Sequence, residues 1–528
     1  MFIQSITTKT YSIMSIFFTL ILGLFFTACG SEGSSTAENE NSSAAVQAAP
    51  TMSDIELIGD FDPSQIIPQG LEATHSDRVR ISVHVEGFTQ GGEASLIGHF
   101  GEQRYRAASA PIDGNGRFVF ENDEPFREGI YVVALPNNTG FQISLVEGQM
   151  DFELKTKRGR LVEDMEVLTP NQEIQLVFAT AQYEAENRSQ IDSINRIINS
   201  LEEGTDERIK QEEERDRLAA QRRAVIMSLT DYYPNSLYGK FKVGGQNPQL
   251  RRELVNEDGT PNLRKQAYHF RNEFWDNVDF SDERLLNTPV IINMTRRYMD
   301  ELVPQNADSI NKYASLLVDR TLDYPDYFQF FANWITNNFD ARNTTIMDPE
   351  AVFVHMIQNY FTHERAFWSD PANIDGLQMR ASEMEASLVG NQAPNVTAND
   401  PDGVPRTLLD SDKDYIIVYI FNPTCEHCMK ETPLLVEWHN NNRDLADVYT
   451  IVLDTDYDEW TQYLRSANMG NFTNVFDPTN RAFYKRYYVD ITPEIYVINP
   501  DRTIIAKNLK TFQIDTMIGR DQERRGIQ

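Results

Sequence analysis

Residues 78–168 alternate between apolar and polar side chains with a period of two. The segments RISVHV, RFVFE, IYVVAL, FQISLV and FELKT are separated by turn-forming residues such as Asp113-Gly114-Asn115-Gly116. This alternation is typical of strands that bury one face, and strands of this length with such turns favour antiparallel pairing. We therefore expect an antiparallel β-sandwich domain over residues 71–170.

After residue 170 the spacing of apolar residues changes to that of helices. Four aliphatic residues follow a 3-4-3 spacing among charged residues: Ile191, Ile194, Ile198 and Leu201. Gly204 interrupts this pattern and a second charged helix continues to about Leu229, which predicts a helical hairpin. Aromatic-rich segments such as DYFQFFANWITNNF follow, and we interpret their aromatic residues as core. We expect a central all-α domain over residues 171–388.

The last 140 residues have a third pattern. Residues 415–421 (YIIVYIF) form a continuous apolar run, as expected for a central strand that is buried on both faces. Further elements follow in βαβ order: a helix at 425–440, a strand at 448–453, a helix at 457–469 and a hairpin at 494–507. This order predicts a C-terminal α/β domain over residues 389–528.

The first 28 residues have the features of a signal peptide. Residues 16–26 are apolar, a run too short to span a bilayer. Small residues that end in a cysteine follow, Thr27-Ala28-Cys29-Gly30, and they resemble the lipobox of bacterial lipoproteins, in which the cysteine is acylated and begins the mature chain. A membrane anchor helix and a simple secretory signal are the alternatives. Residues 29–70, rich in Ser, Ala, Glu and Asn, are expected to be a disordered tether after the acylated cysteine.

Charge and motif content exclude several functions. Because the formal net charge is −31, we expect no basic face that could bind nucleic acid. The sequence contains no glycine-rich phosphate loop, Gly-x-Ser-x-Gly motif or HExxH motif. A structural zinc site would need four ligands, and no second Cys pair exists beside Cys425 and Cys428, so we expect no metal.

The three cysteines point to redox chemistry. A secreted protein that is held together by disulfides would carry more of them. Cys29 is assigned to the lipid, which leaves Cys425 and Cys428 as the redox centre, with no cofactor beyond their own disulfide. Cys425 precedes a predicted helix, whose free N–H groups and dipole stabilise a thiolate. Cys428, one turn later, is then placed to resolve a mixed disulfide.

The two residues between the cysteines, Glu426 and His427, are expected to modulate the site. A protonated histidine beside the thiolate lowers the pKa of the cysteine and makes the disulfide a stronger oxidant. The direction of electron flow therefore stays open at this point.

The C-terminal domain resembles the thioredoxin superfamily and, within it, the TlpA/ResA-like envelope thiol–disulfide oxidoreductases. Four motifs carry the resemblance: Gly390-x-x-Ala393-Pro394, Cys425-Glu426-His427-Cys428, Glu431 with Pro433, and Thr492-Pro493. Thr424 departs from the family, because Trp is usual before the first cysteine. The order of a β-rich, a helical and a thioredoxin-like domain also resembles that of certain bacterial envelope lipoproteins.

The resemblance assigns roles to three further residues. It implies a cis peptide at Thr492-Pro493 that faces the cysteines and positions a substrate chain; the alternative is a trans loop proline. It also implies that the carboxylate of Glu431 lies under the cysteines and assists proton transfer; the alternative is a solvated charge on the helix.

The expected function is reduction of protein disulfides in the bacterial envelope by a lipid-anchored, periplasm-facing enzyme. Its partners would be disulfide-bearing envelope proteins, a thiol electron donor in the membrane or envelope, and the membrane itself. Oxidase or isomerase action is a variant. An AhpC-like thiol peroxidase is an alternative, although Asn422 stands where those enzymes need Thr or Ser. A non-enzymatic envelope interaction protein with a redox-regulated domain is a third possibility.

Overall fold

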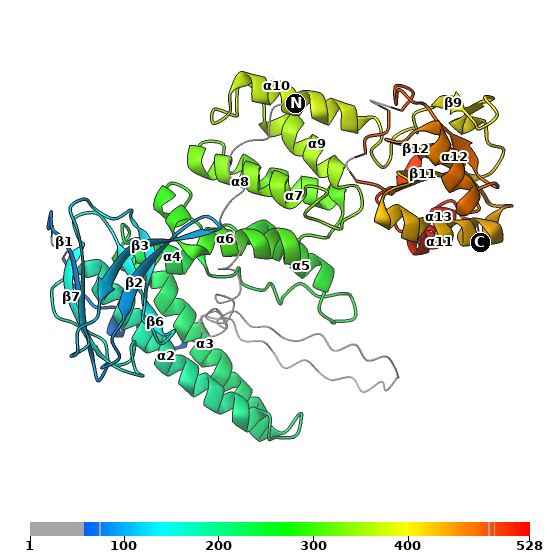
Figure 1. The fold of residues 1–528 in the computed structure, drawn as a ribbon. Coiled ribbons are helices and arrows are strands. Elements are labelled where there is room, and N and C mark those ends of the chain that lie inside the picture. The colour runs from blue at the N-terminus through cyan, green and yellow to red at the C-terminus, as the bar shows by residue number, and fades with distance from the viewer. Residues whose placement is uncertain (1–57, 73–74, 484–485, 490, 528) are drawn as a thin grey trace. The chain divides into compact units, whose positions relative to one another are not determined.

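The computed structural model describes residues 58–72, 75–483, 486–489 and 491–527. The predicted signal peptide (1–28), Cys29 and most of the predicted tether (29–70) lie outside the described residues. The chain divides into two compact units, residues 1–295 and 296–528. Figure 1 shows the order of their helices and strands along the chain.

The first unit begins with two four-stranded sheets. One sheet has the order β4 (Arg117–Asn122), β1 (Val79–Glu86), β7 (Asp151–Lys157) and β8 (Glu166–Val167). The other has the order β3 (Gln103–Pro111), β2 (Glu93–Phe100), β5 (Gly129–Ala134) and β6 (Gly140–Leu145). The predicted β-sandwich is thus present, as alternating burial along β1 illustrates.

The pairing of these strands differs from the prediction at one place. Strands β1 and β7 are parallel, with Ile81 opposite Phe152, whereas the sequence predicted antiparallel pairing throughout. Side chains alternate between the two faces in parallel and antiparallel strands alike, so the period of two carries no information on direction.

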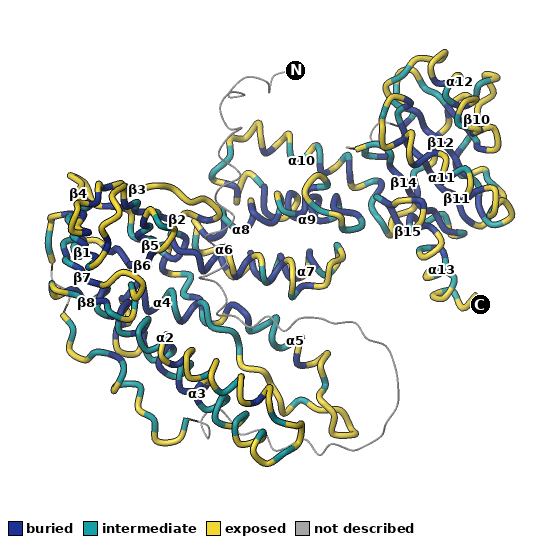
Figure 2. Tube along the Cα trace, turned by 60° about the horizontal axis from the view of Figure 1, so that its bottom comes forward, coloured by how far each residue is buried: buried dark blue, intermediate teal, exposed yellow. Residues whose placement is uncertain are grey.

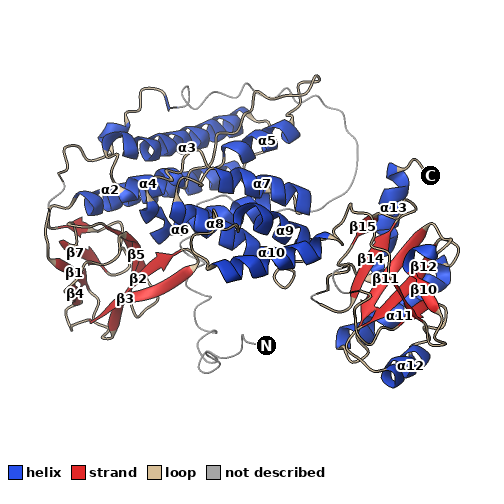
Figure 3. Cartoon of the chain, turned by 90° about the horizontal axis from the view of Figure 1, so that it is seen from above, coloured by secondary structure: helices blue, strands red, loops and turns tan. Residues whose placement is uncertain are grey.

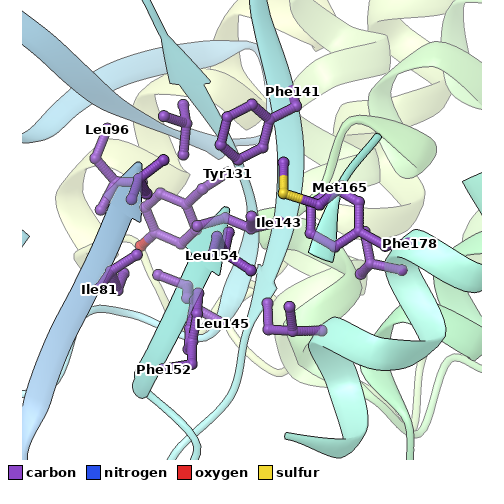
Figure 4. Packing of buried hydrophobic residues seen from close by; sticks show 14 of the residues in the cluster. Ile81, Leu96, Tyr131, Phe141, Ile143, Leu145, Phe152, Leu154, Met165 and Phe178 are labelled. Carbon is purple, nitrogen blue, oxygen red and sulfur yellow. The ribbon is translucent and has the colours of Figure 1, made fainter. Parts of the chain in front are cut away.

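Both sheets and the following helices share one hydrophobic core (Figure 4). The ring of Phe141 on β6 lies 5.9 Å from that of Phe178 on α2 (Gln172–Ile198). Leu229 on α3 (Asp206–Tyr232) is also completely buried in this core. Burying one such side chain stabilises the fold by roughly 1.5–3 kcal/mol. The first helices therefore complete the β-rich unit.

This core explains why the structure divides the chain differently from the sequence. The sequence predicted one helical domain over residues 171–388, but the boundary between units falls between Thr295 and Arg296. The predicted hairpin is present as α2 and α3, and its distal half is largely exposed (Figure 2). The remaining helices of this unit are α4 (Leu237–Gly244), α5 (Leu263–Glu273) and α6 (Pro289–Arg296), with a short η3 (Glu283–Asn287).

The second unit starts with a short segment, η4 (Arg297–Leu302), and four α-helices follow it. They are α7 (Ala307–Asp319), α8 (Pro325–Asn338), α9 (Pro349–Tyr360) and α10 (Pro371–Glu385). Aromatic residues fill the spaces between them, as predicted; the ring of Phe328 lies 6.2 Å from that of Tyr360.

A five-stranded sheet forms the rest of this unit (Figure 3). Its order is β13 (Thr473–Val475), β12 (Ala446–Val452), β11 (Tyr415–Phe421), β14 (Glu494–Ile498) and β15 (Ile504–Ala506). The helices of this part are α11 (Glu426–Asn442), α12 (Tyr457–Ser466) and α13 (Ile514–Arg524). Short elements complete it: β9 (Thr397–Asn399), β10 (Pro405–Thr407), η5 (Leu408–Asp410) and η6 (Thr511–Gln513).

Strand β11 is the centre of this sheet, and every one of its residues is buried. It pairs parallel with β12 and antiparallel with β14, and hydrophobic clusters cover both of its faces. This is the central, doubly covered strand that the continuous apolar run predicted. The predicted α/β order of the C-terminal domain is confirmed, and the fold is thioredoxin-like.

Candidate functional site

The site lies where β11 ends and α11 begins. Cys425 is the N-cap residue of α11 and has an extended backbone. The N–H group of Cys428 donates to the sulfur of Cys425 at 3.4 Å. The sulfur of an N-cap cysteine thus takes the place of the oxygen that usually caps a helix, and it meets the positive end of the helix dipole. This arrangement matches the predicted setting for a thiolate.

The two thiols are free and have unequal environments. Cys425 is half-buried, whereas Cys428 is completely buried. Burial raises the pKa of Cys425, but hydrogen bonds from Cys428, from the side-chain hydroxyl of Thr492 and from the backbone N–H of His427 outweigh it, so the pKa falls below the ordinary value. Burial raises the pKa of Cys428 to about 12. Cys425 is therefore the more accessible and the more acidic of the two thiols, and Cys428 is the protected one.

Thr492 and Pro493 lie next to this pair. The Cys425 thiol donates to the carbonyl oxygen of Thr492 at 3.3 Å. The peptide between Thr492 and Pro493 is cis, as the resemblance implied. Ile491, directly before them in the chain, is 46% exposed, so an apolar side chain precedes Thr492 at the surface.

Glu426 and His427 are both exposed in the first turn of α11. His427 acts on Cys425 through its backbone N–H group, and the sequence reasoning expected an effect of its imidazole charge. Thr424, also exposed, donates through both its N–H and its hydroxyl group to the side chain of Asn422, at 2.7 Å in each case.

Glu431 is buried on α11, one turn after Cys428. Its side chain is only 8% exposed, so it is no solvated helix charge. One carboxylate oxygen accepts a hydrogen bond from the N–H group of Thr511 at 2.6 Å. Residues three apart on a helix are neighbours on its surface, so the carboxylate of Glu431 stands on the side of α11 that carries Cys428.

A group of hydroxyls around the carbonyl oxygen of Cys428 was missed by the sequence analysis. Thr432 donates to this oxygen at 2.8 Å, and its hydroxyl also contacts those of Tyr419 and Tyr463, at 2.8 and 2.9 Å. Tyr419 comes from β11 and Tyr463 from α12, so three elements converge on one peptide group. These contacts support the turn that carries Cys428, just ahead of Pro433, which removes one N–H donor from the helix.

A signal for this group was present in the sequence. Tyr415 and Tyr419 are the only side chains with hydroxyls in an otherwise apolar strand, four residues apart and hence on one face of the sheet. The hydroxyl of Tyr415 donates to Asp521 on α13 at 2.9 Å. Buried tyrosines usually find such partners, so both pointed to polar groups on the covering helices.

Among the residues with described positions, no group of three or more His, Cys, Asp and Glu side chains is arranged to hold a metal ion. Within the same part of the chain, no helix combines the length and apolar character needed to cross a bilayer.

Comparisons with known proteins agree on the C-terminal domain. Residues 389–507 match the AhpC/TSA family. A solved domain of a possible thiol-disulfide isomerase from Cytophaga hutchinsonii is 30% identical over 27% of this chain and 98% of its own, with a TM-score of 0.26. A secreted disulfide oxidoreductase from Mycobacterium tuberculosis is 20% identical over 24% of this chain and 94% of its own, with a TM-score of 0.22.

One similar structure extends beyond that domain. A thioredoxin-like protein from Bacteroides caccae is 18% identical over 52% of this chain and 97% of its own, with a TM-score of 0.44. The comparison with curated proteins gave no match.

Proposed function

Because residues 389–507 match the AhpC/TSA family and the C-terminal domain has a thioredoxin-like fold, we propose that the protein is a thiol–disulfide oxidoreductase that reduces protein disulfides. The observation that carries the proposal is the asymmetry of the pair: a half-buried Cys425 at the start of α11 with a lowered pKa, and a buried Cys428 with a raised one. A nucleophile and a protected resolving thiol are what this reaction needs.

The reaction proceeds in two exchanges. The thiolate of Cys425 attacks one sulfur of a substrate disulfide, forms a mixed disulfide and releases the other substrate sulfur as a thiolate. Cys428 then loses its proton and attacks the sulfur of Cys425, which releases the second substrate thiol and leaves a Cys425–Cys428 disulfide. A dithiol donor returns two electrons and two protons to the pair. Glu431, buried three residues after Cys428, is the proposed proton acceptor in the second exchange.

Insulin reduction tests the proposal. The reduced full-length protein is expected to cleave insulin disulfides, and Cys425→Ser is expected to abolish the activity. A reduction potential near −270 mV would support a reductase and one near −120 mV an oxidase, by analogy with thioredoxin and DsbA. If the protein reduces no disulfide, in insulin or in envelope extracts, the proposal fails.

A thiol peroxidase is the second candidate, because the family that matches residues 389–507 is AhpC/TSA. Asn422 stands three residues before Cys425, and its side chain is occupied by the N–H and hydroxyl groups of Thr424. This arrangement lacks the Thr or Ser that such peroxidases use, which favours the reductase. Turnover of hydrogen peroxide with a thiol donor, at a rate above that of free cysteine, would favour the peroxidase instead.

We further propose that the enzyme acts in the bacterial envelope, anchored by a lipid on Cys29. The apolar run of residues 16–26 and the small residues before Cys29 support this placement. Substrates would be disulfide-bearing envelope proteins, and the electron donor a thiol in the membrane or envelope. The native chain is expected to incorporate radioactive palmitate, and the variant Cys29→Ser is expected not to. Equal labelling of both proteins would contradict lipid attachment at this residue.

A further inference from the structure

Four ionisable side chains are buried in the second unit, on α9 and around β14 and β15. Lys507 follows β15 and is completely buried, with its ammonium 3.2 Å from a carboxylate oxygen of Glu350 and 3.7 Å from one of Asp348. Glu494, the first residue of β14, is 5% exposed and accepts hydrogen bonds from the backbone and the side chain of Asn508. Buried charges are costly unless they are paired, so this cluster fixes the segments that carry it.

The cluster joins two parts of the unit that are far apart in sequence. Asp348 is the N-cap residue of α9, and Glu350 lies in the first turn of that helix. Lys507 and Glu494 belong to the edge of the sheet that contains β14 and β15. The second oxygen of Asp348 accepts the N–H group of Val389 at 2.7 Å, which ties the same helix end to the start of the thioredoxin-like domain.

A second attachment lies on the other side of Thr492. The side chain of Arg380 on α10 donates to the hydroxyl of Tyr488 at 2.9 Å, and its guanidinium lies 4.7 Å from the centre of the Phe353 ring on α9. The backbone N–H of Tyr488 donates to the hydroxyl of Ser387 at 3.2 Å. Ser387 follows α10 and is completely buried. Tyr488 is thus held by the end of the helical region.

Residues 491–494, which we call the Thr492 segment, lie between these two attachments. Tyr488 precedes the segment, and Glu494 ends it. Within it, the carbonyl oxygen of Thr492 accepts the Cys425 thiol at 3.3 Å. A displacement of the segment by about 1 Å would break this contact, because the sulfur–oxygen distance would then exceed that of a hydrogen bond.

We propose that helices α9 and α10 clamp the Thr492 segment against Cys425, with Lys507 and Arg380 as the positioning residues. The inference rests on the proposed function and gives the helical region a role in it. The helices supply no catalytic group. They hold the backbone on both sides of Thr492, which keeps its carbonyl and hydroxyl groups beside the nucleophile.

The test uses three variants of the full-length protein and two matched controls. Arg380→Met removes the guanidinium, Tyr488→Phe removes only its acceptor, and Lys507→Met removes the buried ammonium. Arg465→Met and Tyr457→Phe are the controls, since both side chains are exposed on α12 and make local or surface contacts. The readouts are the pH profile of Cys425 alkylation by iodoacetamide, the KM for insulin and the melting temperature.

The clamp predicts the same change in all three variants. The side-chain hydroxyl of Thr492 lowers the pKa of Cys425, so displacement of this hydroxyl with the Thr492 segment is expected to move the alkylation midpoint to higher pH. Loss of the hydrogen bond from the Thr492 hydroxyl to the thiolate corresponds to alkylation about fivefold slower at pH 7. The KM for insulin is expected to rise, and both controls should behave like the native protein. If Lys507→Met does not fold, the variants of Arg380 and Tyr488 carry the test.

An unchanged alkylation midpoint in Arg380→Met and Tyr488→Phe overturns the clamp, whether or not the melting temperature falls. A shift of equal size in the controls overturns it as well. Alkylation reads the thiol directly, so it tests the clamp even if the native protein reduces no disulfide. A native protein that reduces no disulfide would instead contradict the proposed function.

Discussion

The thiol of Cys425 contacts the carbonyl oxygen of Thr492, 67 residues later in the chain, at 3.3 Å. The contact joins the start of α11 to the residues that precede β14, the neighbour of β11 in the sheet. Antiparallel pairing of β11 and β14 brings the end of one strand beside the start of the other. The topology of the sheet thus creates the site, and four expectations about its chemistry follow.

Cys428→Ser is expected to trap substrates. Cys425 still attacks a disulfide in this variant, but no thiol resolves the product, so mixed disulfides accumulate. Non-reducing gels of envelope extracts should show high-molecular-weight species that disappear with dithiothreitol. The control is Cys425→Ser, which lacks the nucleophile and should form none. Equal trapping by both variants would mean that Cys428 also attacks substrates, in conflict with its complete burial.

The native, reduced protein is expected to be alkylated at Cys425 alone. The pKa of Cys425 is lowered, so its thiolate forms at a lower pH than that of an ordinary cysteine, whose pKa is about 8.5. The pKa of Cys428 is about 12, so this thiol stays protonated and buried. Mass spectrometry after brief iodoacetamide treatment between pH 5 and 9 measures the extent of alkylation at each cysteine. Modification of the two cysteines at similar rates would contradict the asymmetry.

The apolar pattern was sufficient to predict the elements around the site. The run at residues 415–421 became β11 with unchanged ends, because a strand that is buried on both faces needs apolar residues at every position. The edge strand β3 was missed, since its sequence, QRYRAASAP, is mostly exposed and carries no alternation. The cluster of hydroxyl groups around the carbonyl oxygen of Cys428 was missed because Tyr419, Thr432 and Tyr463 are separated in sequence and meet only in the fold.

The sequence also could not predict how the helical region divides between the two units. Helices α2 and α7 both carry apolar residues that become buried, and nothing in their sequences tells which core those residues join. In the structure Phe178 of α2 enters the core of the β-sandwich, whereas α9 shares buried charges with the thioredoxin-like domain. The partners of Lys507 lie about 160 residues upstream of it, a separation at which spacing within the sequence predicts no contact.

Glu431→Gln separates two roles of the buried carboxyl. The substitution keeps an oxygen that accepts the N–H group of Thr511 but removes the charge. If Glu431 accepts the proton of Cys428, release of the mixed disulfide should slow by roughly tenfold or more, with little change in melting temperature. Stopped-flow measurement of mixed-disulfide decay tests this, with the exposed Glu437→Gln on the same helix as control. Unchanged decay would leave Glu431 with a structural role only.

Glu494→Gln is expected to change how stability depends on pH. Burial raises the pKa of Glu494 to about 8, against the opposing effect of Lys507. In the unfolded chain a glutamate loses its proton near pH 4.3, so between about 4.3 and 8 the folded state binds more protons. Stability therefore falls as pH rises through this range, by roughly 5 kcal/mol at most for this one group. Glutamine cannot ionise, so the variant should lose less stability than the native protein between pH 5 and 8.

Urea titrations followed by tryptophan fluorescence measure the difference, with Glu437→Gln as control. The same decline in all three proteins would show that Glu494 is ionised in the folded state throughout this range, and that Lys507 stabilises three carboxylates rather than two.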